Sequence, residues 1–313
     1  MKAVDLGTGT YLDRGIPETL PAAGVYIACR TSEVHGVRER FGWDESVETD
    51  LVNANETVRH SGYNGYDFIS LIHLDVRGKT VGRHVLHLLI GKQAFVSILP
   101  EPAGARLIEL ENELRRFAEA SRDKPDKIEA LYRMVFNRLA SDVSATLEKL
   151  EDDLESLSEA VTEDPRKSHL SEIGRLRKTV YAFKKNLRAT ASVCDGILMN
   201  ENSLLHEEQL QSFRGESARL KKLYDFTESL YELSGEILNI YDSNLSVRMN
   251  ESVSKLTAIM LFLALVTMIT GIFSMDLKFM PSIDSIVGYP LALLVIAVIS
   301  YVIYRVLKRK KWL

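Results

Sequence analysis

The chain has 313 residues, a length that is enough for about two folded domains. Of these residues, 46% are hydrophobic and 26% are charged. Residues 1–254 carry 32 Lys and Arg against 41 Asp and Glu, whereas residues 255–313 carry 7 against 2. The acidic N-terminal part argues against nucleic acid as a partner, because a phosphate backbone requires a basic surface. We also find no nucleophile–base set, nucleotide loop or close cysteine pair, so the sequence does not predict an enzyme or any catalytic residue.

The first predicted domain, residues 1–124, is a cytosolic mixed α/β domain. Apolar, β-branched or alternating runs predict strands at 25–29, 67–76, 84–90 and 93–99. Residues 91–92 form the predicted turn between the last two strands, and a helical pattern follows Gly104. Cys29 and Cys194 are expected to be reduced thiols, packed without a redox role.

Residues 125–206 are predicted to form a cytosolic antiparallel helical segment. One helix carries an apolar seam at spacings of three and four residues: Leu147, Leu150, Leu154, Leu157 and Val161. Another face of this helix is acidic, with Glu148, Asp152, Glu155 and Glu159. That stripe is compatible with loose binding of divalent cations and also with a solvated helix face. Residues 163–165 break the helix, and a basic run follows that is expected to pair with it: Arg166, Lys167, Arg175, Arg177, Lys178, Lys184, Lys185 and Arg188.

A single long stalk helix is predicted over residues 207–275. No proline occurs between Pro165 and Pro281, and the predicted seam consists of Leu223, Phe226, Leu230, Leu233, Ile237 and Ile240. A helix of this length spans roughly 100 Å and is not stable alone. Its seam must therefore be covered by other helices, from the same chain or from further copies.

Two uncharged runs near the C-terminus, residues 256–275 and 285–304, each have the length of a transmembrane helix. Residues 276–284 form a short external loop between them, and residues 305–313 form a basic tail. Positive charges precede the first run and follow the second. By the positive-inside rule we therefore expect a multi-pass protein of the cell inner (cytoplasmic) membrane with both termini in the cytoplasm. Membrane lipid is then a partner of the chain.

Two transmembrane helices per chain are too few to enclose a polar path, so a pore requires several copies around an axis. The stripe along the first transmembrane helix that would line it mixes small, hydroxyl and large apolar side chains: Asn250, Leu256, Met260, Ala264, Thr267 and Gly271. Such side chains also serve ordinary packing between helices, and the stripe alone does not decide between these roles.

Residues 250–281, together with Lys310, Lys311, Trp312 and Leu313, resemble the CorA family of divalent-cation transporters. The resemblance implies an α+β cytosolic domain, a long helical stalk and two C-terminal transmembrane helices. It also implies a funnel-shaped homopentamer with a central pore that chiefly carries Mg²⁺. The acidic stretch at residues 147–155 is similar to the charged helical pair of that family.

The family motif Gly-Met-Asn at the pore mouth is altered here to Ser274, Met275 and Asp276, followed by MetProSerIle at 280–283. Asn250, Leu256 and Thr267 match family positions along the pore. A ring of Asp276 carboxylates would attract an entering cation more strongly than amides, and its members would repel one another when empty. The alternative for Asp276 is a solvated side chain or one paired with Lys278.

The leading functional hypothesis is a CorA-like homopentameric channel or transporter for divalent cations, with Mg²⁺ as the default and Zn²⁺ or Co²⁺ as possible ions. One alternative is a Zn²⁺ transporter similar to ZntB, although that branch typically carries Gly-Ile-Asn at the motif. Another is a membrane-anchored scaffold or sensor that does not transport. Candidate regulatory metal ligands in the cytosolic part are Glu216, Asp225 and Asp75.

Overall fold

A computed structural model of the chain describes residues 1–12, 20–53, 57–120, 127–273 and 288–309. The chain divides into two compact units, which are treated separately below. The first unit contains residues 1–160 and 166–237, and the second contains residues 161–165 and 238–313.

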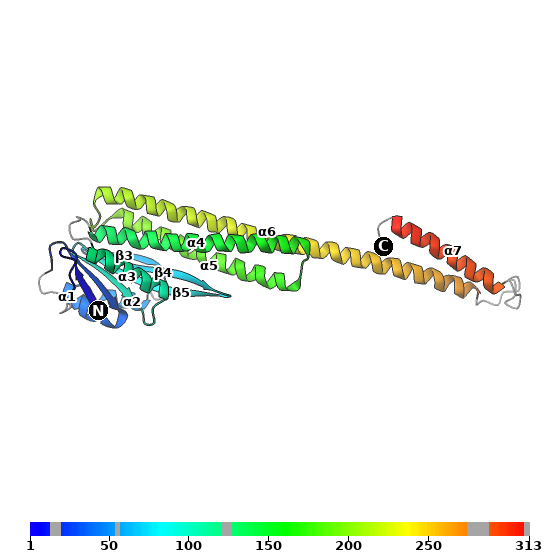
Figure 1. The fold of residues 1–313 in the computed structure, drawn as a ribbon, viewed down its shortest axis with the longest axis horizontal. Helices are drawn as coiled ribbons and strands as arrows, with labels where there is room; N and C mark the ends of the chain where they lie inside the picture. Colours follow the sequence, from blue (N-terminus) through cyan, green and yellow to red (C-terminus); the bar gives the residue numbers. More distant parts are fainter. Residues whose placement is uncertain (13–19, 54–56, 121–126, 274–287, 310–313) are drawn as a thin grey trace. The chain divides into compact units, whose positions relative to one another are not determined.

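The first unit is built on one six-stranded sheet with the order β1-β2-β6-β5-β4-β3 (Figure 1). Its strands are β1 Lys2–Asp5, β2 Val25–Arg30, β3 Arg59–Tyr63, β4 Tyr66–Arg77, β5 Thr80–Gly91 and β6 Ala94–Leu99. Strands β3 to β6 follow one another as antiparallel hairpins, whereas β2 joins β6 in parallel and β1 pairs antiparallel with β2. The four predicted strands are confirmed, and β1 and β3 were not predicted.

Short helices and a third, longer helix cover the sheet. The 3₁₀ helix η1 Thr31–Glu33 leads into α1 Val34–Phe41, and α2 Ser46–Asn53 follows. Val37 of α1 and Leu51 of α2 belong to the same buried cluster as Ile27 and Val96 of the sheet. On the opposite pleat, the Tyr26 hydroxyl donates to the carbonyl oxygen of Glu111, 3.4 Å away, in α3 Ala105–Ala120. The sheet is therefore buried on both faces, as its continuous apolar strands require.

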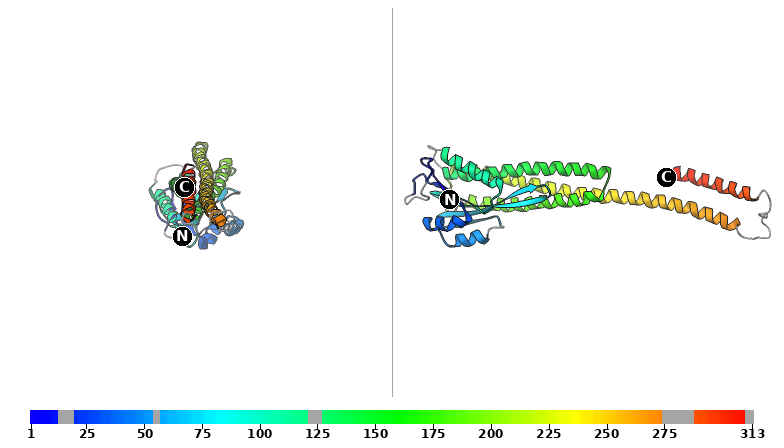
Figure 2. Two further views of the ribbon diagram at one scale, coloured as in Figure 1. Left: turned by 90° about the vertical axis from the view of Figure 1, so that its right-hand side faces the viewer. Right: turned by 60° about the horizontal axis from the view of Figure 1, so that its bottom comes forward.

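Three long helices run beside the sheet: α4 Lys127–Glu163, α5 Lys167–Met199 and the N-terminal part of α6 Glu207–Phe273 (Figure 2). The predicted break at 163–165 is confirmed. Every member of the predicted seam of α4 is buried. The rings of Phe136 on α4 and Phe213 on α6 meet edge to face at 5.1 Å, so aromatic packing joins these two helices.

The predicted seam of α6 is partly wrong. Leu223, Leu230 and Ile237 are buried, but the positions between them on the buried face are Thr227 and Ser234, and Phe226, Leu233 and Ile240 are only half-buried. Both hydroxyls donate to carbonyl oxygens of their own helix over 2.6 Å, at Tyr224 and Tyr231 respectively. A polar side chain satisfied in this way can be buried, and its small size allows close approach of a neighbouring helix.

The basic run on α5 also differs from its prediction. Lys184 lies 2.9 Å from the Glu228 carboxylate of α6, and the Arg177 guanidinium lies 4.6 Å from the centre of the Tyr231 ring. The ion pair that Arg175 makes is within α5, at 3.7 Å from Glu172. Among the described contacts, then, this run interacts with α6 and with its own helix, and not with the acidic stripe of α4.

In the second unit, α6 continues without interruption to Phe273, and α7 spans Gly288–Arg309. Within the described residues, α6 is the one helix that is long and apolar enough to cross a membrane. The described apolar part of α7 is shorter, Leu293–Val302. The second transmembrane helix at 285–304 therefore stays a prediction.

Both cysteines are buried free thiols, as predicted. Burial raises the pKa of Cys29 and of Cys194 to about 12, so both are neutral and unreactive at physiological pH.

His87 is a buried imidazole in the middle of β5. Its ring stacks on Phe68 with 5.7 Å between the ring centres, and the structure gives neither ring nitrogen a hydrogen-bond partner. Burial lowers the pKa of His87 to about 4. The fold therefore holds this side chain in its neutral form.

This burial predicts an acid-sensitive first unit. The unfolded chain binds a proton at His87 below about pH 6.5, whereas the folded chain does so only near pH 4, so stability falls as the pH is lowered between these values. The expected loss is about 3 kcal/mol. We expect His87→Leu to remove most of this dependence when unfolding is followed by Trp43 fluorescence across the same pH range. The exposed His35, changed to Gln, is the control, and an unchanged pH profile in His87→Leu would refute the assignment.

Candidate functional site

From Leu256 to its end at Phe273, α6 has no charged side chain and an apolar surface on all sides. Long apolar side chains lie exposed around its whole circumference: Leu256, Ile259, Met260, Leu261, Phe262, Leu263 and Met268. A helix that is apolar all round is covered by lipid or by other helices. This segment therefore requires a membrane or further copies of the chain.

The six candidate pore-lining residues that the structure describes are all on α6, and all six are exposed: Asn250, Leu256, Met260, Ala264, Thr267 and Gly271. Successive members are separated by six, four, four, three and four residues. At 3.6 residues per turn this spacing keeps them on one side of the helix. The regular helix thus preserves the predicted stripe, while its role in a pore stays a prediction.

Hydroxyl groups near the stripe have their protons engaged. Thr257 and Thr267 donate to the carbonyl oxygens of Val253 and Leu263, each over 2.8 Å, and Thr270 donates to that of Val266 over 3.0 Å. A hydroxyl that donates to its own helix keeps its lone pairs for other donors. These oxygens are therefore acceptors, which suits the outward-pointing hydrogens of a hydrated cation.

The turn between α4 and α5 is attached to α6 just before this stripe. Arg248 places one guanidinium nitrogen 2.6 Å from an Asp164 carboxylate oxygen and another 3.3 Å from the Glu163 carbonyl oxygen. One turn earlier, the Asn244 side-chain amide donates to the Val161 carbonyl oxygen over 3.2 Å. We call these contacts the turn anchor. It holds the turn at the start of the candidate segment, and sequence analysis did not predict it.

The predicted regulatory residues do not come together within one chain. Glu216 and Asp225 are nine residues apart on α6, two and a half turns, so they point to opposite sides of the helix. Asp75 lies on β4, where its carboxylate accepts a hydrogen bond from Arg77 over 2.6 Å. Within the described residues, no group of three His, Cys, Asp or Glu is placed to hold a metal ion. The regulatory role of Glu216, Asp225 and Asp75 stays a prediction.

Asp75 also lines a cavity of about 270 Å³ between β4 and α4, with His73, Asp142 and Asp153. A nitrogen of the His73 ring lies 3.5 Å from an Asp142 oxygen. Burial lowers the pKa of His73, although the nearby Asp142 acts in the opposite direction. Arg106 and Lys149 line the same space and offset two of its three carboxylate charges, which does not favour a cation site.

The predicted pore mouth, Ser274, Met275 and Asp276, lies outside the described residues. The acidic stripe of α4 is described, and its four carboxylates, Glu148, Asp152, Glu155 and Glu159, are exposed. The stripe is thus a solvated helix face in the single chain.

Comparisons with known proteins agree on one family. The family model described as CorA-like Mg²⁺ transporter protein matches residues 28–309. The cobalt/magnesium transport protein CorA of Thermotoga maritima is 25% identical over 305 residues, which cover 97% of this chain and 85% of that protein.

Solved structures share the fold. The complete CorA magnesium transporter from Methanocaldococcus jannaschii has a TM-score of 0.83 at 20% identity, covering 100% of this chain and 98% of its own. Full-length CmaX has a TM-score of 0.76 at 16% identity, covering 99% and 97%. The ZntB cytoplasmic domain from Vibrio parahaemolyticus has a TM-score of 0.64 at 13% identity, covering 79% and 98%. These likenesses establish the fold, which is an α/β domain with long helices. Proteins named CorA, CmaX and ZntB all share this fold.

The turn anchor yields a prediction about local stability. Arg248→Met removes both guanidinium contacts while keeping the aliphatic stem, and an exposed charged pair contributes about 0.5–1 kcal/mol. We therefore expect amide hydrogen exchange in residues 161–166 to become roughly two- to fivefold faster. Lys255→Met, which removes the next positive charge on the same helix, is the control. Equal exchange in the two variants would show that the anchor does not hold the turn.

Proposed function

Since this chain belongs to the family of CorA-like Mg²⁺ transporter proteins, we propose that it moves divalent cations across a membrane through a pore shared by several copies. The observation that carries the proposal is the family match over residues 28–309, which includes the whole of α6. The family consists of ion transporters and not of enzymes. In that family a long stalk helix of the soluble part continues directly into the first membrane helix. Here α6 is likewise one continuous helix.

Several copies are needed because one apolar helix cannot shelter a charged ion from lipid. The family resemblance implies five copies, with α6 of each bordering the central path. The exposed stripe from Asn250 to Gly271 then faces the axis, and the remaining apolar surface faces lipid or neighbouring helices. Both chain ends lie in the cytoplasm of a cell whose inner membrane holds the protein.

Mg²⁺ is the proposed ion, and Co²⁺ is the next candidate, because the Thermotoga maritima relative is named for both. Mg²⁺ gives up its water reluctantly. A path lined by acceptor oxygens such as that of Thr267 can hold the hydrated ion without removing its shell. A ring of Asp276 carboxylates at the mouth would collect the ion electrostatically.

The membrane potential supplies the driving force. A charge gains about 2.3 kcal/mol per 100 mV on entering the negative interior, so a divalent ion gains about 4.6 kcal/mol. No chemical step is needed for uptake in this direction.

The test is ion flux into liposomes that contain the purified chain and a dye sensitive to Mg²⁺, Co²⁺ or Zn²⁺. We expect Mg²⁺ entry that saturates with external concentration. Asp276→Asn replaces a ring of charges with amides, so the half-saturating Mg²⁺ concentration should rise about tenfold or more. Asp284→Asn, which removes the other acidic side chain of the same external segment, is the matched control and should change it much less.

Each result has a distinct meaning. Flux of Zn²⁺ alone, driven by a proton gradient, would replace the proposal with a ZntB-like function. No flux of any ion would favour a scaffold or sensor. Equal behaviour of the two variants would remove Asp276 from the pore mouth, and native mass spectrometry of the same sample counts the copies.

A further inference from the structure

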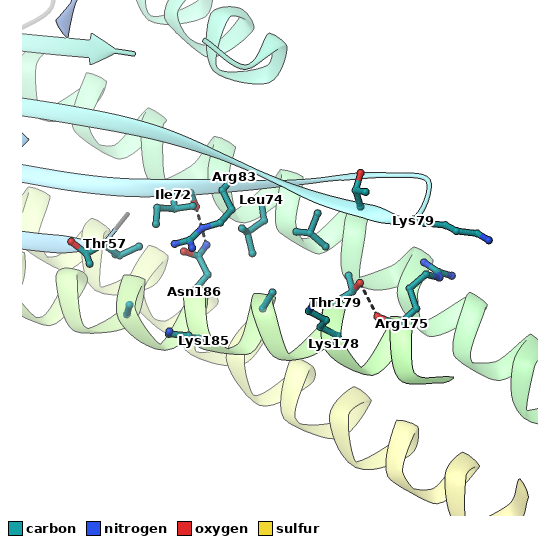
Figure 3. Close-up of a pocket in the computed structure, with 15 residues that line it drawn as sticks. Thr57, Ile72, Leu74, Lys79, Arg83, Arg175, Lys178, Thr179, Lys185 and Asn186 are labelled. Carbon is teal, nitrogen blue, oxygen red and sulfur yellow. Dashed lines mark hydrogen bonds between the residues drawn. The ribbon is translucent and has the colours of Figure 1, made fainter. Parts of the chain in front are cut away.

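A cleft of about 830 Å³ lies in the first unit between the β4–β5 hairpin and α5 (Figure 3). Its volume is in the range of small-molecule sites. Arg83 extends from β5 toward Asn186 on α5, and Arg175 points from α5 toward the hairpin. The cleft is therefore bordered by side chains from two separate elements.

The charge of this cleft is unlike that of the surrounding protein. Its lining includes five basic side chains and no acidic one: Lys79, Arg83, Arg175, Lys178 and Lys185. Residues 1–254 as a whole are strongly acidic. Three of the five, Lys79, Lys178 and Lys185, are exposed, so their ammonium groups are accessible to a ligand from solution. Arg175 is already paired with Glu172 at 3.7 Å, so the three lysines supply the charge open to a ligand, and together they favour an anion that carries several negative charges.

The floor of the cleft is apolar. Ile72 and Leu74 of β4, Val81 of β5 and Ala182 and Ala189 of α5 line it. The polar groups on this floor are already engaged, because the Asn186 amide donates to the Ile72 carbonyl oxygen over 2.8 Å and the Thr179 hydroxyl donates to the Arg175 carbonyl oxygen over 3.1 Å. A ligand that fits must therefore combine a flat or apolar body with a multiply charged end.

We propose that this cleft binds a nucleoside di- or triphosphate, with the base on the apolar floor and the phosphates among the basic side chains. Guanidinium groups bind phosphate oxygens through paired hydrogen bonds, and ammonium groups add point charges around them. The sequence has no glycine-rich phosphate loop, so side chains and not backbone amides make the contacts. The proposal is separate from ion transport and does not depend on the ion that the chain carries.

The acidic stripe of α4 from another copy is the main competing occupant. Its carboxylates could pair with the basic side chains. However, the apolar residues of that helix, among them Leu147, Leu150 and Leu154, are buried within their own unit. A docked α4 would therefore place carboxylates over Ile72, Leu74 and Val81 and leave this apolar floor uncovered. A nucleotide would contact both the basic side chains and the apolar floor, whereas a docked helix would contact only the basic side chains.

The experiment measures binding of a fluorescent ATP analogue to the purified full-length protein, in the presence of EDTA, with unlabelled ATP, tripolyphosphate, adenosine and inorganic phosphate as competitors. We expect a dissociation constant below about 1 mM for ATP, weaker binding of tripolyphosphate, and no measurable binding of adenosine or phosphate at that concentration. The cleft variant is Lys79→Gln, Lys178→Gln and Lys185→Gln together. Its three side chains are exposed, so the fold should be retained, and a thermal midpoint within a few degrees of the wild type checks this.

The control variant changes three exposed lysines of the same unit that do not line the cleft: Lys2→Gln, Lys92→Gln and Lys222→Gln. The net charge change is identical. We expect the cleft variant to weaken ATP binding at least tenfold and the control variant less than threefold. Equal weakening in both, or no binding to the wild type, would overturn the proposal. Tripolyphosphate binding as tight as ATP would overturn the assignment of a nucleotide, and carbodiimide crosslinks from Lys178 to α4 of another copy would assign the cleft to a subunit contact instead.

Discussion

The structure depends on one constraint, which is that α6 is a single helix with two different environments along its length. Its first part is covered by α4 and α5 of its own chain, through Leu223, Leu230 and Ile237. From Leu256 onward most of its apolar side chains are exposed, among them Ile259, Leu263 and Met268. Removing such a surface from water is worth roughly 25 cal/mol per Å², so this part of the helix is not stable in solution by itself. Lipid or other helices must therefore cover this part of α6.

The covered part of α6 shows how small polar residues allow this arrangement. Thr227 and Ser234 occupy the buried face and satisfy their hydroxyls within the helix. Their small volume lets neighbouring helices approach, and charged contacts such as Lys184 with Glu228 and Lys221 with Asp195 lie outside the seam. The covered part of α6 therefore combines a closely packed core with a polar surface that is exposed to water.

Sequence patterns predicted the elements that carry a strong period. The seam of α4, the strands β2, β4, β5 and β6, and the unbroken α6 all have apolar residues at regular spacing. The edge strand β3 was missed because ArgHisSerGlyTyr has no apolar alternation. Its extended conformation comes from antiparallel pairing with β4 and not from a pattern of its own. The seam of α6 was misplaced because periodicity counts Phe226 as core and Thr227 as surface. The turn anchor joins Asp164 and Arg248, which are 84 residues apart and belong to no common pattern, so only the folded chain reveals it.

The threonine hydroxyls of α6 have a consequence for the sign of the ions that a shared path would admit. A chloride ion is solvated by hydrogen-bond donors. The hydroxyl protons of Thr257, Thr267 and Thr270 are already donated to backbone carbonyl oxygens. Anions would therefore lose their hydration there without compensation, whereas water bound to a metal ion would find partners. Discrimination between positive and negative ions would then arise from the direction of hydrogen bonds alone. The membrane interior need hold no fixed charge to achieve it, and so avoids the cost of burying one.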